Sequence, residues 1–250
     1  ERFFGNRLVA GAGVAVDPAV WDRLAIPGPP PPDGSPIGAG FDGSISRDGT
    51  WLVGESADGR AFVIQKWVRP SNDSREMREW RAEHPGRDWR VNRPEVLAAV
   101  TAMRKRWRVG RLLCDPPKWE TEIEGWITEF GKDANNEDVC VMEDTNQPRR
   151  FARITDRWLV AIAEGSFHHD GNPDLADDVK STHLRKVELK AEEGDGRTRI
   201  VLVKGDDHRR IDGCVACALA HTAAMTMAPP PVKFRSPFND PSYVPQYVRP

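Results

Sequence analysis

The sequence predicts an α/β fold in which helices flank a mixed central sheet of five strands. Short apolar segments that end at Gly, Pro or Asp alternate with segments of helical periodicity. The first three strands follow one another without a helix between them, whereas the fourth follows an amphipathic helix. With 250 residues, of which 39% are hydrophobic and 30% charged, the chain can bury one good core.

Composition excludes several classes of protein. No apolar run approaches the roughly 20 residues of a membrane span, and no basic start leads into an apolar leader segment. The four cysteines lie in apolar runs, which predicts reduced thiols in a cytosol rather than a disulfide framework. The chain starts at Glu1, so we expect a piece of a longer protein.

Proline-rich stretches suggest the domain boundaries. Residues 1–35 are expected to form a linker from a missing N-terminal region, because the four prolines ending at Pro32 cannot continue a strand or helix. Residues 36–228 are expected to form the core domain, and residues 229–250 a proline-rich tail.

The core is predicted to open with a three-stranded meander. Its strands cover about residues 37–42, 49–56 and 60–68, and Asp58-Gly59 is a hairpin signal. An irregular excursion rich in Arg and Trp follows.

The next elements alternate between helix and strand. A crossover helix is predicted from Asn92, whose side chain could cap it, to Trp107. The sequence then predicts a strand at 109–114, a helix from Trp119 to Phe130, a strand at 139–142, a helix that stops at Gly165, and a short helix after Asn172. An added β-hairpin with arms at 184–190 and 199–203 precedes an alanine-rich helix that begins near Asp212.

This topology places three acids together. A right-handed crossover lays strand 109–114 parallel to the first strand, which gives the order 3-2-1-4-5 and a switch point between strands 1 and 4. Asp42 and Asp115 end these two strands, and Asp212 joins them if the last helix packs back across this end of the sheet. Carboxylates this close repel one another unless cations lie among them, so we predict Mg²⁺ or Mn²⁺, with two ions suiting phosphodiester hydrolysis.

These residues resemble the C-terminal nuclease domain of phage terminase large subunits, over about residues 36–226. The resemblance rests on short motifs: Gly40 to Ser44 with Asp48 and Thr50, Cys114-Asp115-Pro116, Gly165 to His169, Gly171-Asn172-Pro173 with Leu175, and Arg210 to Gly213. It implies an RNase H-like fold, with Asp42, Asp115 and Asp212 as the catalytic and metal-binding acids. The implied activity is a metal-dependent DNA endonuclease that cuts concatemeric viral DNA during genome packaging.

The resemblance also implies partners and a place of action. Double-stranded DNA would be the substrate, and the partners would be the packaging ATPase domain of the same protein, the small terminase subunit and the portal. The work would take place in the host cytoplasm, at the procapsid. No G-x-x-x-x-G-K-[ST] loop occurs in these 250 residues, so ATP hydrolysis is not assigned to them.

Two other functions remain open. One is a non-catalytic RNase H-like DNA-binding module, in which the three acids would have no chemical role. The other is an actin-like phosphotransferase, which also opens with a strand ending in Asp-Gly but needs a second phosphate loop and a duplicated fold that 250 residues cannot easily supply.

Cations gather in two stretches despite the net charge of −2. Residues 69–93 contain seven arginines interleaved with Trp80 and Trp89, and a second cluster covers residues 104–111. The DNA-binding candidates are Arg75, Arg78, Arg81, Arg104, Arg106 and Lys186. The alternative is a solvated surface with cations at a helix C-terminus. The predicted hairpin has basic arms and an acidic tip, and either gates access of DNA to the metals or is a plain structural ribbon.

Other acids and potential ligands are expected to be structural. The candidate auxiliary ligands are Asp48, Glu143, Asp144, Asp206 and Asp207, and we favour solvated roles for them. His168 and His169 point to opposite faces if extended, so a shared metal site is disfavoured. Cys214-x-x-Cys217 lacks a matched second pair for zinc.

Overall fold

The computed structural model describes residues 13–46, 48–188, 198–206 and 209–228. The predicted hairpin tip, Asp207 and the proline-rich tail lie outside these residues. Within the described ranges, every helix is too short or too polar to cross a lipid bilayer.

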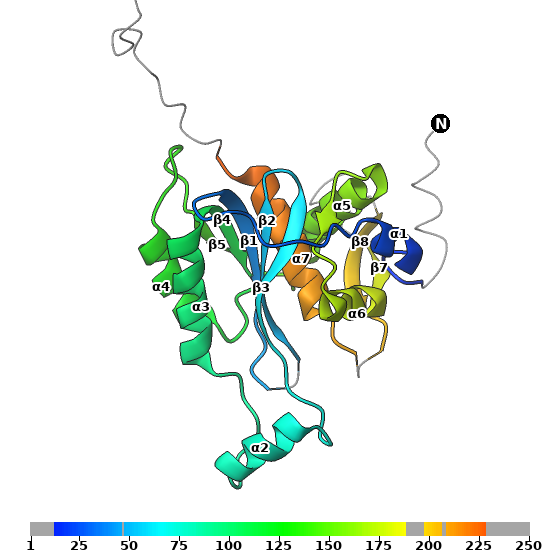
Figure 1. The fold of residues 1–250 in the computed structure, drawn as a ribbon. Helices are drawn as coiled ribbons and strands as arrows, with labels where there is room; N and C mark the ends of the chain where they lie inside the picture. The colour runs from blue at the N-terminus through cyan, green and yellow to red at the C-terminus, as the bar shows by residue number, and fades with distance from the viewer. Residues whose placement is uncertain (1–12, 47, 189–197, 207–208, 229–250) are drawn as a thin grey trace, which may run out of the picture.

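A six-stranded mixed sheet forms the centre of the fold, in the order β5-β4-β1-β2-β3-β6 (Figure 1). The strands are β1 (Pro36–Asp42), β2 (Thr50–Ser56), β3 (Arg60–Trp67), β4 (Arg108–Cys114), β5 (Cys140–Met142) and β6 (His168–His169). β1 pairs antiparallel with β2 and parallel with β4, so the predicted order 3-2-1-4-5 is confirmed. The sequence missed β6, whose two residues are too few for a periodic signal.

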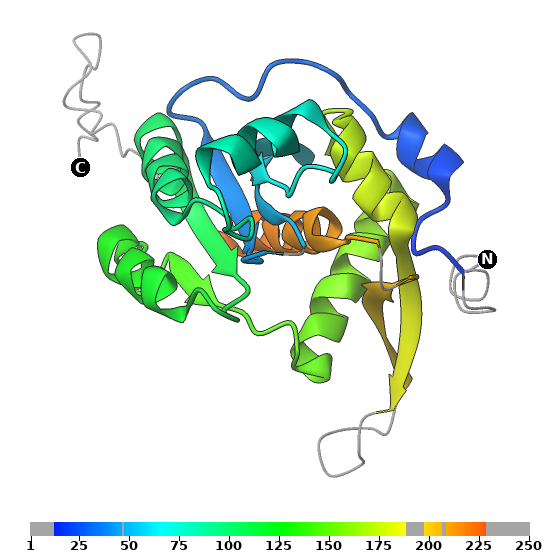
Figure 2. The same cartoon turned by 90° about the horizontal axis from the view of Figure 1, so that it is seen from below.

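Helices cover both faces of the sheet (Figures 1 and 2). On one face lie α3 (Arg93–Arg106) and α4 (Glu120–Phe130). On the other face α7 (Asp212–Thr226) crosses the strands, and α5 (Pro148–Glu164) and α6 (Pro173–Ser181) lie beyond it. The added hairpin is confirmed as a separate two-stranded sheet of β7 (Thr182–Glu188) and β8 (Thr198–Lys204), which packs on α5.

Part of the stretch expected to be a linker packs onto the core. It contains the short helix α1 (Pro18–Arg23), whose Trp21 is fully buried. The ring of His169 stacks on Trp21 at a centroid distance of 4.0 Å, and its Nε2 lies 2.9 Å from the Trp21 carbonyl oxygen. This contact joins residues far apart in sequence, so no local signal predicts it.

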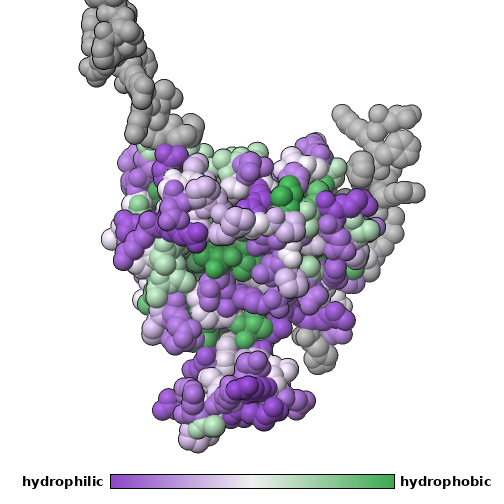
Figure 3. All heavy atoms as spheres, in the orientation of Figure 1, coloured by the Kyte–Doolittle hydropathy of each residue, from purple (hydrophilic) through white to green (hydrophobic). Residues whose placement is uncertain are grey.

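The excursion expected to be irregular contains a helix, α2 (Arg75–Glu83). Ser74 caps it, because its hydroxyl accepts a hydrogen bond of 3.0 Å from the backbone N–H of Met77. At the start of α3 the predicted cap is not formed. The Asn92 side chain accepts no hydrogen bond from the backbone of the helix, and it donates to the Glu95 side chain instead. Figures 1 and 3 show α2 projecting from the body of the molecule with a hydrophilic surface.

β1 and α7 meet backbone to backbone. Ile37, Ala39 and Phe41 of β1 face the cluster under α3 and α4, so the alternating Gly38 and Gly40 face α7. A Cβ atom at Gly40 would stand 2.1 Å from the Ala216 carbonyl oxygen, and one at Gly38 would stand 2.1 Å from the Ala224 nitrogen. Later residues of β1 therefore meet earlier residues of α7, which brings Asp212 to the same end of the sheet as Asp42.

The substitution Gly40→Ala should destabilise the protein by about 3 kcal/mol, because backbone atoms of α7 cannot turn aside as a side chain can. The measurement is the free energy of unfolding in urea. The matched control is Gly125→Ala in α4, where a Cβ atom would meet nothing within 4 Å. There the better helix propensity of alanine should add about 0.5–1 kcal/mol. Equal effects of the two substitutions would contradict the close contact of β1 with α7.

Candidate active site

Asp42 and Asp115 stand side by side where β1 and β4 end. The backbone N–H of Asp115 donates to the Phe41 carbonyl oxygen at 2.9 Å, which continues the parallel pairing of the strands. Residues two positions apart in a strand point to the same face of the sheet. Asp42 is two positions after Gly40 and Asp115 two after Leu113, and both of these earlier residues face α7. Both carboxylates therefore lie on the α7 face of the sheet.

Asp212 is the first residue of α7 and reaches the turn between β1 and β2. Its Oδ2 accepts a hydrogen bond of 3.1 Å from the backbone N–H of Gly49. Across the site, Oδ1 of Asp115 accepts a bond of 2.9 Å from the N–H of Thr145. The structure thus brings the three predicted acids to one end of the sheet, and the two flanking carboxylates are each oriented by a backbone donor.

All three carboxyl groups are buried, and each is at most 9% exposed. Burial raises the pKa of Asp42 well above its usual range, and the charges of Asp212 and Asp115 raise it further. Burial, with the charge of Asp48, raises the pKa of Asp212 to about 6. The pKa of Asp115 is also raised, chiefly by burial.

Tryptophan rings pack closely against Gly43 and Gly213, the glycines that directly follow Asp42 and Asp212. A Cβ atom at Gly43 would stand 2.3 Å from Nε1 of Trp119, and one at Gly213 would stand 2.9 Å from Cε2 of Trp51. The rings of Trp51 and Trp119 are at most 1% exposed. The two rings therefore add apolar surface next to the residues that follow Asp42 and Asp212.

Sequence reasoning missed a fourth buried acid, Asp178 on α6. Its Oδ2 accepts a bond of 2.7 Å from the N–H of Gly213, and so caps α7 where the side chain of Ile211 cannot. Burial raises the pKa of Asp178 to about 7, and the charge of Asp212 adds to the shift. One signal could have found it, since Asp178 shares a helix face with the buried Leu175 and Val179.

The donor atoms suit a divalent cation, although they do not form a ready-made cage. Among the described residues, no group of three His, Cys, Asp or Glu side chains lies close enough to hold one ion as it stands. The carboxylate oxygens are nevertheless hard ligands of the kind that Mg²⁺ and Mn²⁺ prefer. Lys204 pairs with Asp48 at 2.6 Å, and its charge lowers the pKa of Asp212 against the larger effect of burial.

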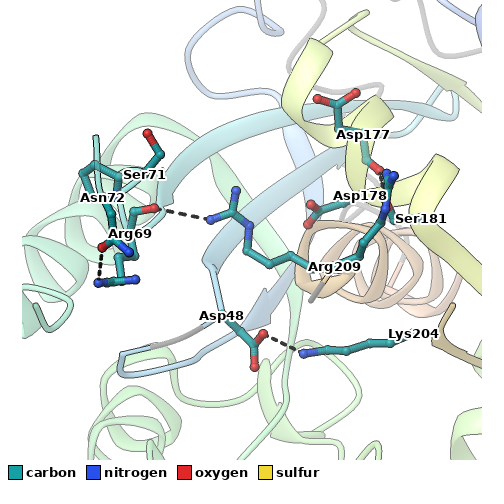
Figure 4. Close-up of a pocket in the computed structure, with 11 residues that line it drawn as sticks. Asp48, Arg69, Ser71, Asn72, Asp177, Asp178, Ser181, Lys204 and Arg209 are labelled. Atoms are coloured by element: carbon teal, nitrogen blue, oxygen red, sulfur yellow. Dashed lines mark hydrogen bonds and ion pairs between the residues drawn. The ribbon is translucent and has the colours of Figure 1, made fainter. Parts of the chain in front are cut away.

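A cavity of about 880 Å³ opens beside these acids (Figure 4). Its lining comes from the segment after β3, from α6, and from the link between β8 and α7. The lining residues are Asp48, Arg69, Pro70, Ser71, Asn72, Asp177, Asp178, Ser181, Lys204, Arg209 and Arg210.

The predicted DNA-binding residues of α2 are exposed but bonded locally. Arg75 pairs with Glu79 at 2.6 Å, Arg78 donates to the Asp73 carbonyl oxygen, and Arg81 donates to Asn72. Three glutamates balance the three arginines, so α2 carries no net charge.

Arg104 and Arg106 lie far from the acids. They end α3, and β4 starts directly after them and runs toward Asp115, so the length of β4 separates them from it. Arg104 pairs with Glu129 at 3.1 Å and Arg106 with Asp33 at 2.8 Å. The remaining candidate, Lys186, is exposed on β7.

The residues around His169 hold the fold together. His169 contacts Trp21 as described above, and the pKa of His169 is lowered, chiefly by burial. Asp170 accepts bonds of 2.9 Å from the N–H groups of Val63 and Asn172. The four cysteines are free and buried, as predicted.

The fold and the positions of the three acids together define the structural class of this domain. A mixed sheet with carboxylates at the ends of two adjacent parallel strands, and a helix that brings a third acid across them, is an RNase H-like arrangement. Among solved structures, the large terminase of bacteriophage HK97 matches 83% of this chain and 43% of its own, with a TM-score of 0.56 and 18% identity. The large terminase nuclease from thermophilic phage G20c, solved with bound magnesium, matches 82% of this chain and 95% of its own, with a TM-score of 0.51 and 10% identity.

At this level of identity the matches establish a shared fold, and the predicted likeness to terminase nuclease domains is confirmed for the fold. The Gene 13 proteins of Mycobacterium phages D29 and L5 are 29% and 27% identical to the chain over 239 residues. The aligned region is 89% of this chain but 37% of each relative, so the chain spans well under half of their length. No family model matches the chain.

The stability of the metal-free protein should fall as pH rises from about 4 to about 7. Unfolded aspartates release their protons near pH 3.8, whereas folded Asp212 and Asp178 hold theirs to about 6 and about 7. The folded state binds more protons in this window, so the free energy of unfolding decreases with pH. Urea unfolding in EDTA at pH 4.5 and pH 7 measures the slope.

Asp212→Asn should remove part of this slope and make the protein more stable than wild type at pH 7, by about 1–3 kcal/mol. Asp138→Asn, which removes an exposed charge before β5, is the matched control and should leave the slope unchanged. A wild-type protein with equal stability at both pH values would show that folding does not raise the pKa values of these acids.

Proposed function

We propose that this chain is a metal-dependent DNA endonuclease of the large-terminase type, which cuts concatemeric viral DNA during genome packaging. The observation that carries the proposal is the meeting of Asp42, Asp115 and Asp212 at one end of the sheet. The fold shared with the G20c nuclease, which was solved with bound magnesium, supports it.

The three acids would hold Mg²⁺ or Mn²⁺, with Asp42 between the other two. Asp212 and Asp115 each give one oxygen to a backbone N–H, which fixes the carboxylate and leaves its second oxygen for an ion. Their raised pKa values mean that a cation replaces protons when it binds. Two bound ions would activate a water molecule and stabilise the leaving oxygen of the phosphodiester.

The substrate and partners follow from the same proposal. Double-stranded DNA is the substrate, and Arg75, Arg78, Arg81 and Lys186 are its candidate contacts outside the acids. Arg104 and Arg106 could touch DNA only if it extended to the opposite end of β4. A packaging ATPase domain, a small terminase subunit and a portal would be the partners, at the procapsid in the host cytoplasm.

The purified chain should nick supercoiled plasmid in Mg²⁺ or Mn²⁺ and be silent in EDTA. Asp42→Asn, Asp115→Asn and Asp212→Asn should each lower the rate by more than about a hundredfold, because each removes a charged metal ligand. Gel analysis of nicked and linear product measures the rate, and thermal unfolding confirms that each variant is folded.

Asp138→Asn is again the control and should cut at the wild-type rate. DNA binding without cleavage in any metal would favour a non-catalytic RNase H-like module, and ATP consumption would favour an actin-like phosphotransferase. Cleavage that persists in excess chelator would refute the metal mechanism.

A further inference from the structure

Three arginines converge on the cavity beside Asp212 from segments far apart in the chain. Arg69 follows β3, whereas Arg209 and Arg210 precede α7. Asp48, Asp177 and Asp178 in the same lining offset part of the repulsion among these cations, and an anion bound among the arginines would offset more of it. Lys204, at the end of β8, adds a fourth cation to the lining.

Within the described part of the chain, the guanidinium groups of these arginines donate hydrogen bonds to uncharged acceptors. Arg69 donates to the Asn72 side chain at 2.7 Å, Arg209 to the Ser181 hydroxyl at 3.4 Å, and Arg210 to the Arg69 carbonyl oxygen at 3.5 Å. All three acceptors are neutral, and two of the bonds are at the long limit. A guanidinium carries five N–H donors in a planar fork that matches the oxygens of a phosphate.

The rest of the lining favours a nucleic-acid backbone over a small apolar ligand. Small-molecule pockets are lined mainly by apolar and aromatic side chains. Here the lining is charged or carries short hydrogen-bonding side chains, with Pro70 as the exception. Figure 4 shows Lys204 reaching toward Asp48 and Arg209 reaching toward Ser181.

The cavity is linked to the acids through two residues of its lining. Asp178 lines it and bonds to Gly213, the neighbour of Asp212. Asp48 also lines it, and its charge raises the pKa values of Asp42 and Asp212. A phosphate seated among the arginines would therefore lie close to the phosphodiester presented to the acids.

We propose that this cavity seats backbone phosphates of the DNA strand that is cut, on the Asp212 side of the acids. Arg69, Arg209 and Arg210 bind these phosphates, and Lys204 contributes charge from its pair with Asp48. The proposal rests on the proposed function, and it moves the main DNA contact away from α2 and from the end of α3.

The test is binding of a fluorescent DNA duplex, measured by anisotropy in EDTA over a range of salt concentrations. In Arg209→Gln/Arg210→Gln, affinity should fall at least about tenfold, and the slope of log affinity against log salt should fall by about 2. Lys105→Gln/Arg108→Gln removes the same charge from exposed residues at the far end of β4, and should change both quantities little.

Two further variants separate contact from folding. Arg209→Lys/Arg210→Lys keeps the charge but not the fork, so the salt slope should stay near wild type while affinity falls less than in the glutamine variant. Arg69→Gln alone should lower the slope by about 1. Thermal unfolding reports whether each variant is folded, and the lysine variant tests the proposal if the glutamine variant is not.

A series of DNA duplexes, each with one backbone phosphate replaced by a neutral methylphosphonate, locates the phosphate that contacts the arginines. One neutral phosphate, within a few nucleotides of the cut, should weaken binding to the wild type but not to Arg209→Gln/Arg210→Gln. Two results would show that the cavity does not bind a backbone phosphate. One is an equal loss of affinity in Arg209→Gln/Arg210→Gln and Lys105→Gln/Arg108→Gln. The other is a scan in which every methylphosphonate has the same effect on the wild type and on Arg209→Gln/Arg210→Gln. Wild-type DNA binding without metal-dependent cleavage would instead refute the proposed function and leave the cavity result standing.

Discussion

The direct contact between the backbones of β1 and α7 is the constraint on which the candidate site depends. Gly38 and Gly40 leave no side chain between strand and helix, so the distance between Asp42 and Asp212 is set by main-chain atoms. A buried contact of 2.9 Å between His221 and Glu55 adds a polar anchor in the same interface. Because backbone cannot rearrange as side chains do, the approach of the acids is a property of the fold.

Most of the fold was predictable because its signals are local. Apolar runs that end at Asp or Gly located β1 to β5, and helical spacing located α3 to α7. The parts that were missed depend on distant contacts. Helix α1 is held on the core by the stacking of Trp21 on His169, a residue far away in sequence. Helix α2 has a single buried side chain, Met77, and one apolar position cannot produce a periodic pattern.

The site divides in the same way. Asp42 and Asp115 could be selected as candidates because strand ends are visible in sequence, and Asp212 because its motif opens a helix. The role of Asp178 was not found, because it caps a helix other than its own. The meeting of the cavity arginines was not predictable for a related reason: Arg69 belongs to the arginine-rich stretch 69–93, but Arg210 lies 141 positions further on and meets it only in the folded chain. Runs of arginine in sequence therefore pointed to α2 and the end of α3 rather than to this cavity.

The Asp-Gly pairs at Asp42 and Asp212 have a consequence beyond turn formation. Each glycine admits an indole ring, and in the described part of the chain the ring nitrogens of Trp51 and Trp119 have no hydrogen-bond partner. Walls of this kind keep water away and offer little compensation to the carboxylates. By admitting the indole rings, the two glycines therefore act on carboxylates that they do not touch, because an apolar surrounding favours the protonated form of an acid.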